Sequence, residues 1–92
     1  MSIQWLYDVI EERRQNPSES SYTTRLFAGG LPKIAQKVGE EGTEVVVAAL
    51  AQDDQRLIEE VADLTYHTLV LLAARGLKPE NVLAELEKRH NR

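Results

Sequence analysis

The chain has 92 residues, a formal net charge of −4 at pH 7 and no cysteine. A chain of this length is expected to form one small domain over residues 1–92, with a thin hydrophobic core. The lack of cysteine excludes disulfide bonds and thiolate metal sites, and it favours a reducing, cytoplasmic location. The negative charge argues against nucleic acid as a partner. No apolar run approaches the roughly 18 residues of a membrane-spanning helix, so no membrane is expected as a partner either.

Apolar residues recur at helical spacing along most of the chain, and no stretch alternates with the period of a strand. The first helix is predicted over residues 3–15. A short second helix is predicted over residues 22–28, with Ser20 or Ser21 as its N-cap and a glycine pair at its end.

Two long helices follow, over residues 32–52 and 54–75. Pro32 suits the first turn of one, and an aspartate at the junction caps the other, which ends at Gly76. Pro79 opens a last helix with a basic end. The predicted fold is all-α, a bundle of four to five helices in which the short linker makes the two long helices antiparallel.

Five acidic residues form two motifs, E-E-x-x-E and E-x-x-D, each within one of the long helices. Residues three or four apart share a helix face, so Glu41 pairs with Glu44, and Glu60 pairs with Asp63. Two packed helices of this kind gather four or five carboxylates into one pocket. Oxygen ligands suit Mg²⁺, with Mn²⁺ as an alternative, and both ions also hold substrate phosphates.

A solvated helix face is the ordinary explanation for such acidic residues. Two features favour a metal site instead. Glu41 interrupts an apolar stripe between Val38 and Val45, and the second motif directly precedes the apolar run 69–74. Carboxylates at the margin of a core need a cation, hydrogen bonds or a proton.

A metal-bound polyphosphate also requires basic partners from the protein. Lys37 lies one turn before the first acidic motif, and Lys33 and Arg25 lie further upstream. For the lysines, an ordinary ion pair on the helix surface is the alternative. His67 follows the second motif by one turn. Three roles are open for it: a contact to the substrate, a hydrogen-bond partner of a metal ligand, or a core residue whose hydrogen bonds are satisfied within the protein.

The chain resembles the phosphoribosyl-ATP pyrophosphohydrolases in several short strings. These are S-Y-T at 21–23, K-V-G-E-E-G-T-E-V at 37–45, and E-V-A-D-L with Y-H at 60–67, together with Leu86 and Arg89. The resemblance covers nearly the whole chain. The acidic motifs alone are similar to those of the wider all-α nucleoside triphosphate pyrophosphohydrolase superfamily, and the fuller strings favour the phosphoribosyl-ATP branch.

This resemblance implies Mg²⁺-dependent hydrolysis of phosphoribosyl-ATP to phosphoribosyl-AMP and pyrophosphate, the second step of histidine biosynthesis. It also implies a homodimer with helices exchanged across the interface. Some relatives are fused to a zinc-dependent cyclohydrolase, whereas this chain is expected to act as the stand-alone enzyme. The implied metal ligands are Glu41, Glu44, Glu60 and Asp63. Glu44 and Glu40 are expected to take part in catalysis, with Glu40 positioning the attacking water. The expected substrate contacts are Tyr22, Thr23, Arg25, Lys33, Lys37 and His67.

A homodimer is also expected from composition, because the long helices carry more apolar surface than a monomer of this length can bury. Two other functions stay open. One is hydrolysis of another nucleoside triphosphate, which shares the metal chemistry. The other is a non-catalytic helical dimerisation module, against which Glu41 argues, since a pure interface favours an apolar residue in that stripe.

Overall fold

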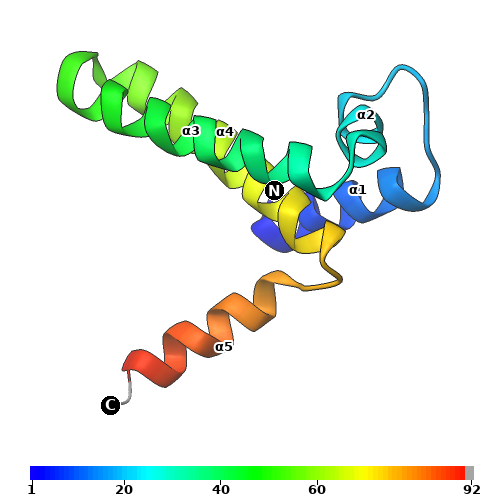
Figure 1. Ribbon diagram of the computed structural model, residues 1–92. Helices are drawn as coiled ribbons and strands as arrows, with labels where there is room; N and C mark the ends of the chain where they lie inside the picture. The colour runs from blue at the N-terminus through cyan, green and yellow to red at the C-terminus, as the bar shows by residue number, and fades with distance from the viewer. Residues whose placement is uncertain (91–92) are drawn as a thin grey trace.

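The computed structural model describes residues 1–90, which form five helices and no strand (Figure 1). The helices are α1 (Ile3–Gln15), α2 (Tyr22–Gly29), α3 (Leu31–Ala51), α4 (Asp54–Ala74) and α5 (Pro79–His90). The all-α class is therefore confirmed, and the predicted helix ends lie within one residue of the observed ones. The helices α3 and α4 pack side by side as an antiparallel hairpin, joined by a turn of two residues.

Side-chain caps set where three helices begin. Ser2, Ser21 and Asp53 each accept a hydrogen bond from the backbone N–H three residues further on. Such caps satisfy amide groups that have no partner within the helix. The helix α3 lacks a side-chain cap and starts instead from Gly30, whose φ of 85° is readily adopted only by glycine, with Pro32 in the first turn.

The hydrophobic core lies where α1, α2 and the beginning of α3 meet the end of α4. Its buried members are Tyr7, Ile10, Leu26, Ile34, Leu69, Val70 and Ala73. Burying an aliphatic side chain of this size fully contributes about 1.5–3 kcal/mol. The core therefore fixes one end of the α3–α4 hairpin against α1 and α2.

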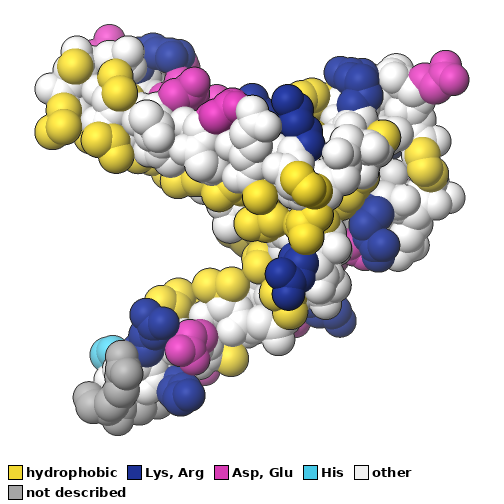
Figure 2. Space-filling model, viewed as in Figure 1, with side chains coloured by type: hydrophobic (Ala, Val, Ile, Leu, Met, Phe, Trp, Pro, Cys, Tyr) yellow, Lys and Arg dark blue, Asp and Glu magenta, His cyan; other side chains and the backbone are white. Residues whose placement is uncertain are grey.

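The other end of the hairpin and α5 project away from this core (Figure 1). Both carry apolar side chains on their surface, which appear in yellow in Figure 2. On the hairpin the exposed residues are Val46, Val47, Leu50, Ile58 and Val61, and on α5 they are Val82, Leu83 and Leu86. Within residues 1–90, no helix has both the length and the apolar character needed to cross a bilayer.

Candidate metal centre

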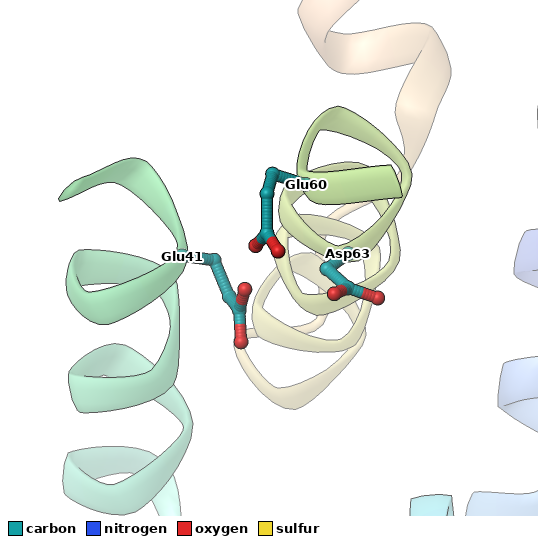
Figure 3. A group of neighbouring side chains, drawn as sticks. All are labelled: Glu41, Glu60 and Asp63. Carbon is teal, nitrogen blue, oxygen red and sulfur yellow. The ribbon is translucent and has the colours of Figure 1, made fainter. Parts of the chain in front are cut away.

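Glu41, Glu60 and Asp63 converge between α3 and α4 (Figure 3). One carboxylate oxygen from each lies within 4.8 Å of the other two. Glu41 comes from α3, while Glu60 and Asp63 are one turn apart on α4, so antiparallel packing brings the two motifs face to face. Opposite ligands of an octahedral Mg²⁺ are about 4 Å apart, so side-chain shifts of roughly 1 Å or less would bring the three groups onto one ion.

Two of these carboxylates are buried with half of their hydrogen-bonding capacity unused. Glu41 is 6% exposed and Glu60 is 5% exposed. Lys37 Nζ lies 3.7 Å from one oxygen of Glu41, and Arg56 donates a 2.7 Å hydrogen bond to one oxygen of Glu60. The second oxygens, Glu41 Oε2 and Glu60 Oε2, are buried without a partner. Leaving such an oxygen unpaired costs about 1–3 kcal/mol, a cost that a cation between the two side chains removes.

Glu44 lies at the exposed side of the cluster, next to both buried glutamates. Burial, followed by contact with Glu44, raises the pKa of Glu41 above its usual value. Contact with Glu44, followed by burial, raises the pKa of Glu60. The pKa of Glu44 is lowered, because its ionised form accepts hydrogen bonds from Glu60 and Glu41 when they are protonated. The three carboxyl groups cannot all ionise cheaply without a positive charge among them, and a divalent cation supplies that charge.

Two basic residues flank the cluster from opposite directions. Lys37 precedes Glu41 by one turn on α3, and Arg56 precedes Glu60 by one turn on α4. Because the helices are antiparallel, Lys37 lies toward the core and Arg56 lies toward the α3–α4 turn. Together with Glu44 and Glu60, Arg56 lines an open cavity of about 230 Å³. Arg56 is absent from the residues predicted from sequence, although its i−4 spacing from a glutamate is the same signal that identified Lys37.

His67 is buried one turn after Asp63 and uses both ring nitrogens. Its Nδ1 lies 2.7 Å from the backbone carbonyl oxygen of Asp63, and its Nε2 lies 2.8 Å from the hydroxyl oxygen of Tyr22. Tyr22 is the first residue of α2, and 44% of it is exposed. These contacts connect α2 to the segment of α4 that carries Asp63.

Two more of the predicted substrate contacts surround this connection. The guanidinium of Arg25 lies 5.9 Å from the centre of the Tyr22 ring, a cation–π geometry. Thr23 is buried, and its hydroxyl is hydrogen-bonded to the hydroxyl of Tyr66 on α4. Thr23 therefore fastens α2 to α4, and only Tyr22 and Arg25 of this group present surface to a ligand.

Glu40 and Lys33 lie outside the cluster. Glu40 is exposed, with Lys37 Nζ at 3.8 Å and a 2.9 Å hydrogen bond from Gln36. Lys33 is exposed too, and no ion pair formed among residues 1–90 includes it. The structure thus brings Glu41, Glu44, Glu60 and Asp63 together and leaves Glu40 and Lys33 at the surface.

Comparison of the sequence with known proteins identifies the family of the chain. The family model described as phosphoribosyl-ATP pyrophosphohydrolase matches residues 3–90. The chain is 54% identical over 91 residues to the phosphoribosyl-ATP pyrophosphatase of Lacticaseibacillus casei, covering 99% of this chain and 83% of the relative. The enzyme of the same name from Sulfurisphaera tokodaii is 54% identical over 84 residues, covering 91% and 89%. That from Clostridium botulinum is 48% identical over 90 residues, covering 98% and 82%. The chain therefore belongs to the phosphoribosyl-ATP pyrophosphohydrolase family of hydrolases.

Proposed function

We propose that this protein hydrolyses phosphoribosyl-ATP to phosphoribosyl-AMP and pyrophosphate, the second step of histidine biosynthesis, with Mg²⁺ in the acidic cluster. The observation that carries the proposal is the pair of buried, unpartnered oxygens on Glu41 and Glu60, two residues whose carboxylates converge with that of Asp63 between α3 and α4 in a member of this family. Mn²⁺ suits the same hard oxygen ligands and is the alternative cation.

Glu41, Glu60 and Asp63 are the residues that would hold the ion, and Glu44 completes the set from the exposed side. An ion bound there offsets the charge of the triphosphate and lowers the pKa of a coordinated water. The carboxylates fix this position because two of them are buried and both helices are anchored in the core.

Lys37 and Arg56 are suited to hold the phosphates on the two sides of the cluster. Each is paired with a buried carboxylate, and each can turn to a phosphate oxygen when that carboxylate has another partner. Hydrolysis between the first and second phosphorus leaves one phosphate on the nucleoside and two on the leaving group. Basic groups on opposite sides of the metal centre match that division of charge.

Glu44 is the best-placed acceptor for the proton of the attacking water. It is the exposed glutamate of the cluster, so water reaches it directly, whereas the carboxylate of Glu40 is held outside the cluster by Gln36 and Lys37. A carboxylate in hydrogen-bond reach of the nucleophile acts as a general base. We therefore assign that role to Glu44 and leave Glu40 as a partner of Lys37.

A homodimer is proposed as the working form. An apolar groove of about 480 Å³ between α1, α4 and α5 is lined by residues that include Ile3, Leu64, Leu72 and Leu83. The apolar side chains on α5 continue this surface away from the core (Figure 2). A second copy brings the same surface and pairs with it about a twofold axis, which is the commonest arrangement of protein oligomers. Leaving so much apolar surface in water is atypical of a monomer.

The direct test is pyrophosphate release from phosphoribosyl-ATP and from a panel of ordinary nucleoside triphosphates, with either Mg²⁺ or EDTA. Release that is fastest with phosphoribosyl-ATP and absent in EDTA supports the proposal. Release only from another triphosphate reassigns the substrate while keeping the metal chemistry. Lack of release from every nucleotide identifies a non-catalytic module.

A further inference from the structure

In a neutral imidazole, the two hydrogen bonds of His67 determine which ring nitrogen carries the hydrogen. A backbone carbonyl oxygen only accepts, so the Nδ1 that contacts the Asp63 carbonyl carries the hydrogen. The neutral ring has a single N–H, which leaves Nε2 as an acceptor. The Tyr22 hydroxyl is 2.8 Å from Nε2 and therefore donates its hydrogen to it.

This arrangement determines whether the Tyr22 hydroxyl oxygen can donate or accept a hydrogen bond when a ligand binds. A phenol has one hydrogen to donate, and in Tyr22 that hydrogen is committed to His67. The lone pairs of the oxygen remain, so Tyr22 offers an acceptor on a side chain that is 44% exposed. Phosphate oxygens at neutral pH are themselves acceptors and cannot pair with it. A hydroxyl or amino group can.

We propose that His67 is a positioning residue, which sets the Tyr22 hydroxyl to recognise a hydrogen-bond donor on the nucleoside part of the substrate and not a phosphate. The proposal rests on the proposed function and adds an orientation to it. The nucleoside lies at the Tyr22 and Lys37 end of the site, and the leaving pyrophosphate lies at the Arg56 end.

The position of Tyr22 along the hairpin agrees with this orientation. Tyr22 is bonded to His67, which lies one turn beyond Asp63 on α4, toward the core. Lys37 lies one turn before Glu41 on the antiparallel α3, and therefore on the same side of the acidic cluster. Arg25 stacks near the Tyr22 ring and adds a positive charge at the same end. The donor in a purine nucleotide is either a ribose hydroxyl or the amino group of the base, and the experiment separates the two.

The tautomer of His67 can be measured without substrate or metal. We expect ¹⁵N-edited imidazole spectra at about pH 8 to show that His67 carries its hydrogen on Nδ1. Because the chain has two histidines, the signals of His67 are assigned as those that disappear in the His67→Gln variant. Tyr22→Phe should shift the Nε2 resonance and leave the proton on Nδ1. A proton on Nε2 in the wild-type protein would overturn the proposal.

Steady-state kinetics on phosphoribosyl-ATP test the coupling of the two residues. Tyr22→Phe and His67→Phe should each raise KM by about three- to tenfold, the factor for one hydrogen bond, with kcat nearly unchanged. The double variant should be no worse than either single one, because both remove the same contact. His67→Gln should recover most of the loss, since an amide oxygen can accept from Tyr22. Additive effects, or a Tyr22→Phe enzyme with wild-type KM, contradict the proposal.

A matched control removes the other side-chain hydrogen bond described above between α2 and α4, that of Thr23 with Tyr66. Tyr66→Phe deletes the hydrogen bond to Thr23 and leaves Tyr22 and His67 untouched. If His67 merely held α2 in place, Tyr66→Phe would raise KM as much as His67→Phe does. The proposal expects a KM near that of the wild type.

Product inhibition decides which part of the substrate Tyr22 contacts. Tyr22→Phe should weaken inhibition by phosphoribosyl-AMP by the same three- to tenfold factor, about that of one hydrogen bond, and leave inhibition by pyrophosphate unchanged. Weaker inhibition by pyrophosphate would place Tyr22 on a phosphate and refute the orientation. Substrate made with 2′,3′-dideoxy-ATP or with ITP identifies the donor as a hydroxyl of the nucleoside ribose or as the amino group of the base, and wild-type binding of both contradicts recognition of the nucleoside.

These outcomes are separable from failure of the proposed function. A wild-type protein that releases no pyrophosphate from phosphoribosyl-ATP disproves the activity, whatever the state of His67. The positioning of Tyr22 is then judged by the tautomer measurement alone, in which an Nε2–H ring rejects it and an Nδ1–H ring supports it.

Discussion

Arg56 donates a 2.7 Å hydrogen bond to Glu60, and the second carboxylate oxygen of Glu60 is buried without any partner. The same arrangement recurs on the facing helix, where Lys37 lies beside one oxygen of Glu41 and the other oxygen is unpaired. Lys37 and Arg56 thus each pair with only one of the two oxygens of a buried carboxylate. The two carboxylates converge with that of Asp63 between α3 and α4, where a divalent ion would pair with both.

Neutralising one acidic ligand should separate activity from stability. We predict that Glu44→Gln and Asp63→Asn abolish Mg²⁺-dependent pyrophosphate release and leave the melting temperature in EDTA unchanged or higher. Each substitution removes a negative charge from a crowded cluster and also removes a hard ligand. Circular dichroism melts and a pyrophosphate assay on the same samples provide the two measurements.

The control for these variants is Glu12→Gln, an exposed glutamate on α1 whose loss should change neither quantity. A structural network of salt bridges predicts the opposite outcome for Glu44 and Asp63. In that case both variants melt well below the wild type and keep their activity.

Arg56 should contribute to stability and to substrate binding. We predict that Arg56→Met lowers the free energy of unfolding in EDTA, by less than the loss of a fully buried pair would, because Arg56 is half exposed. Mg²⁺ should restore part of this loss, since it pairs with Glu60 in place of Arg56. The KM for phosphoribosyl-ATP should rise, because a phosphate contact is missing.

Urea titrations with and without Mg²⁺ measure the first two effects. Arg89→Met, which removes an exposed arginine paired with Glu85 on α5, is the matched control. An Arg56→Met protein that is as stable in EDTA as the wild type and binds substrate equally well would show that the pair is incidental.

The metal-free protein should become more stable on mild acidification. Burial and neighbouring carboxylates raise the folded-state pKa of Glu41 and Glu60 above 4.5, the ordinary value for glutamate. The folded state therefore binds these protons more tightly than the unfolded chain does. The resulting stability is fully present below pH 4.5 and is lost as the pH rises through the raised pKa values. The pKa of Glu44 is lowered, so its opposite contribution changes only below pH 4.5.

The measurement is a series of urea titrations in EDTA between about pH 5 and pH 8, comparing wild type with Glu41→Gln. Subtracting the two profiles cancels the groups remote from the cluster and leaves the contribution of Glu41 together with its interactions with Glu44 and Glu60. The wild type should gain more stability than the variant as the pH falls. Parallel profiles for the two proteins would exclude a raised pKa at Glu41.

The apolar face of α5 should be needed for association. The chain has a mass of 10.4 kDa, and we predict a sedimenting species of twice that mass at micromolar concentration. Leu83→Glu places a charge in the apolar groove and should shift the equilibrium toward monomer. Glu87→Gln on the same helix is the control. A stable folded monomer of the wild-type protein at micromolar concentration contradicts the proposed dimer.

Most of the fold could be predicted because its signals are local. Ser21 and Asp53 mark helix starts through hydrogen bonds made within three residues, and Gly76 ends α4 with a φ of 72°. The burial of Glu41 follows from its place in an apolar stripe, since the helical repeat fixes which side chains share a face. Such information is contained in the sequence itself.

The remaining features depend on contacts between distant segments. Tyr22 and His67 are 45 positions apart, and no periodicity shows that a hydrogen bond joins them. Glu40 lies next to Glu41 in sequence, yet a rotation of about 100° per residue places it outside the cluster. Arg56 had a usable signal, its i−4 spacing to Glu60, but an exposed arginine on a helix is ordinarily a surface ion pair. Tertiary packing gives it a second neighbour in the cavity beside Glu44.

We predict above all that a divalent ion binds between Glu41, Glu60 and Asp63. Crystals grown with Mn²⁺ and measured at an X-ray energy sensitive to manganese locate that ion independently of any activity. An anomalous peak is expected among these three carboxylates, at metal–oxygen distances of about 2.1–2.2 Å, and it should be lost in Glu60→Gln. An Mn²⁺ peak elsewhere, or an empty cluster in which the two buried oxygens of Glu41 and Glu60 bind only water, would contradict it.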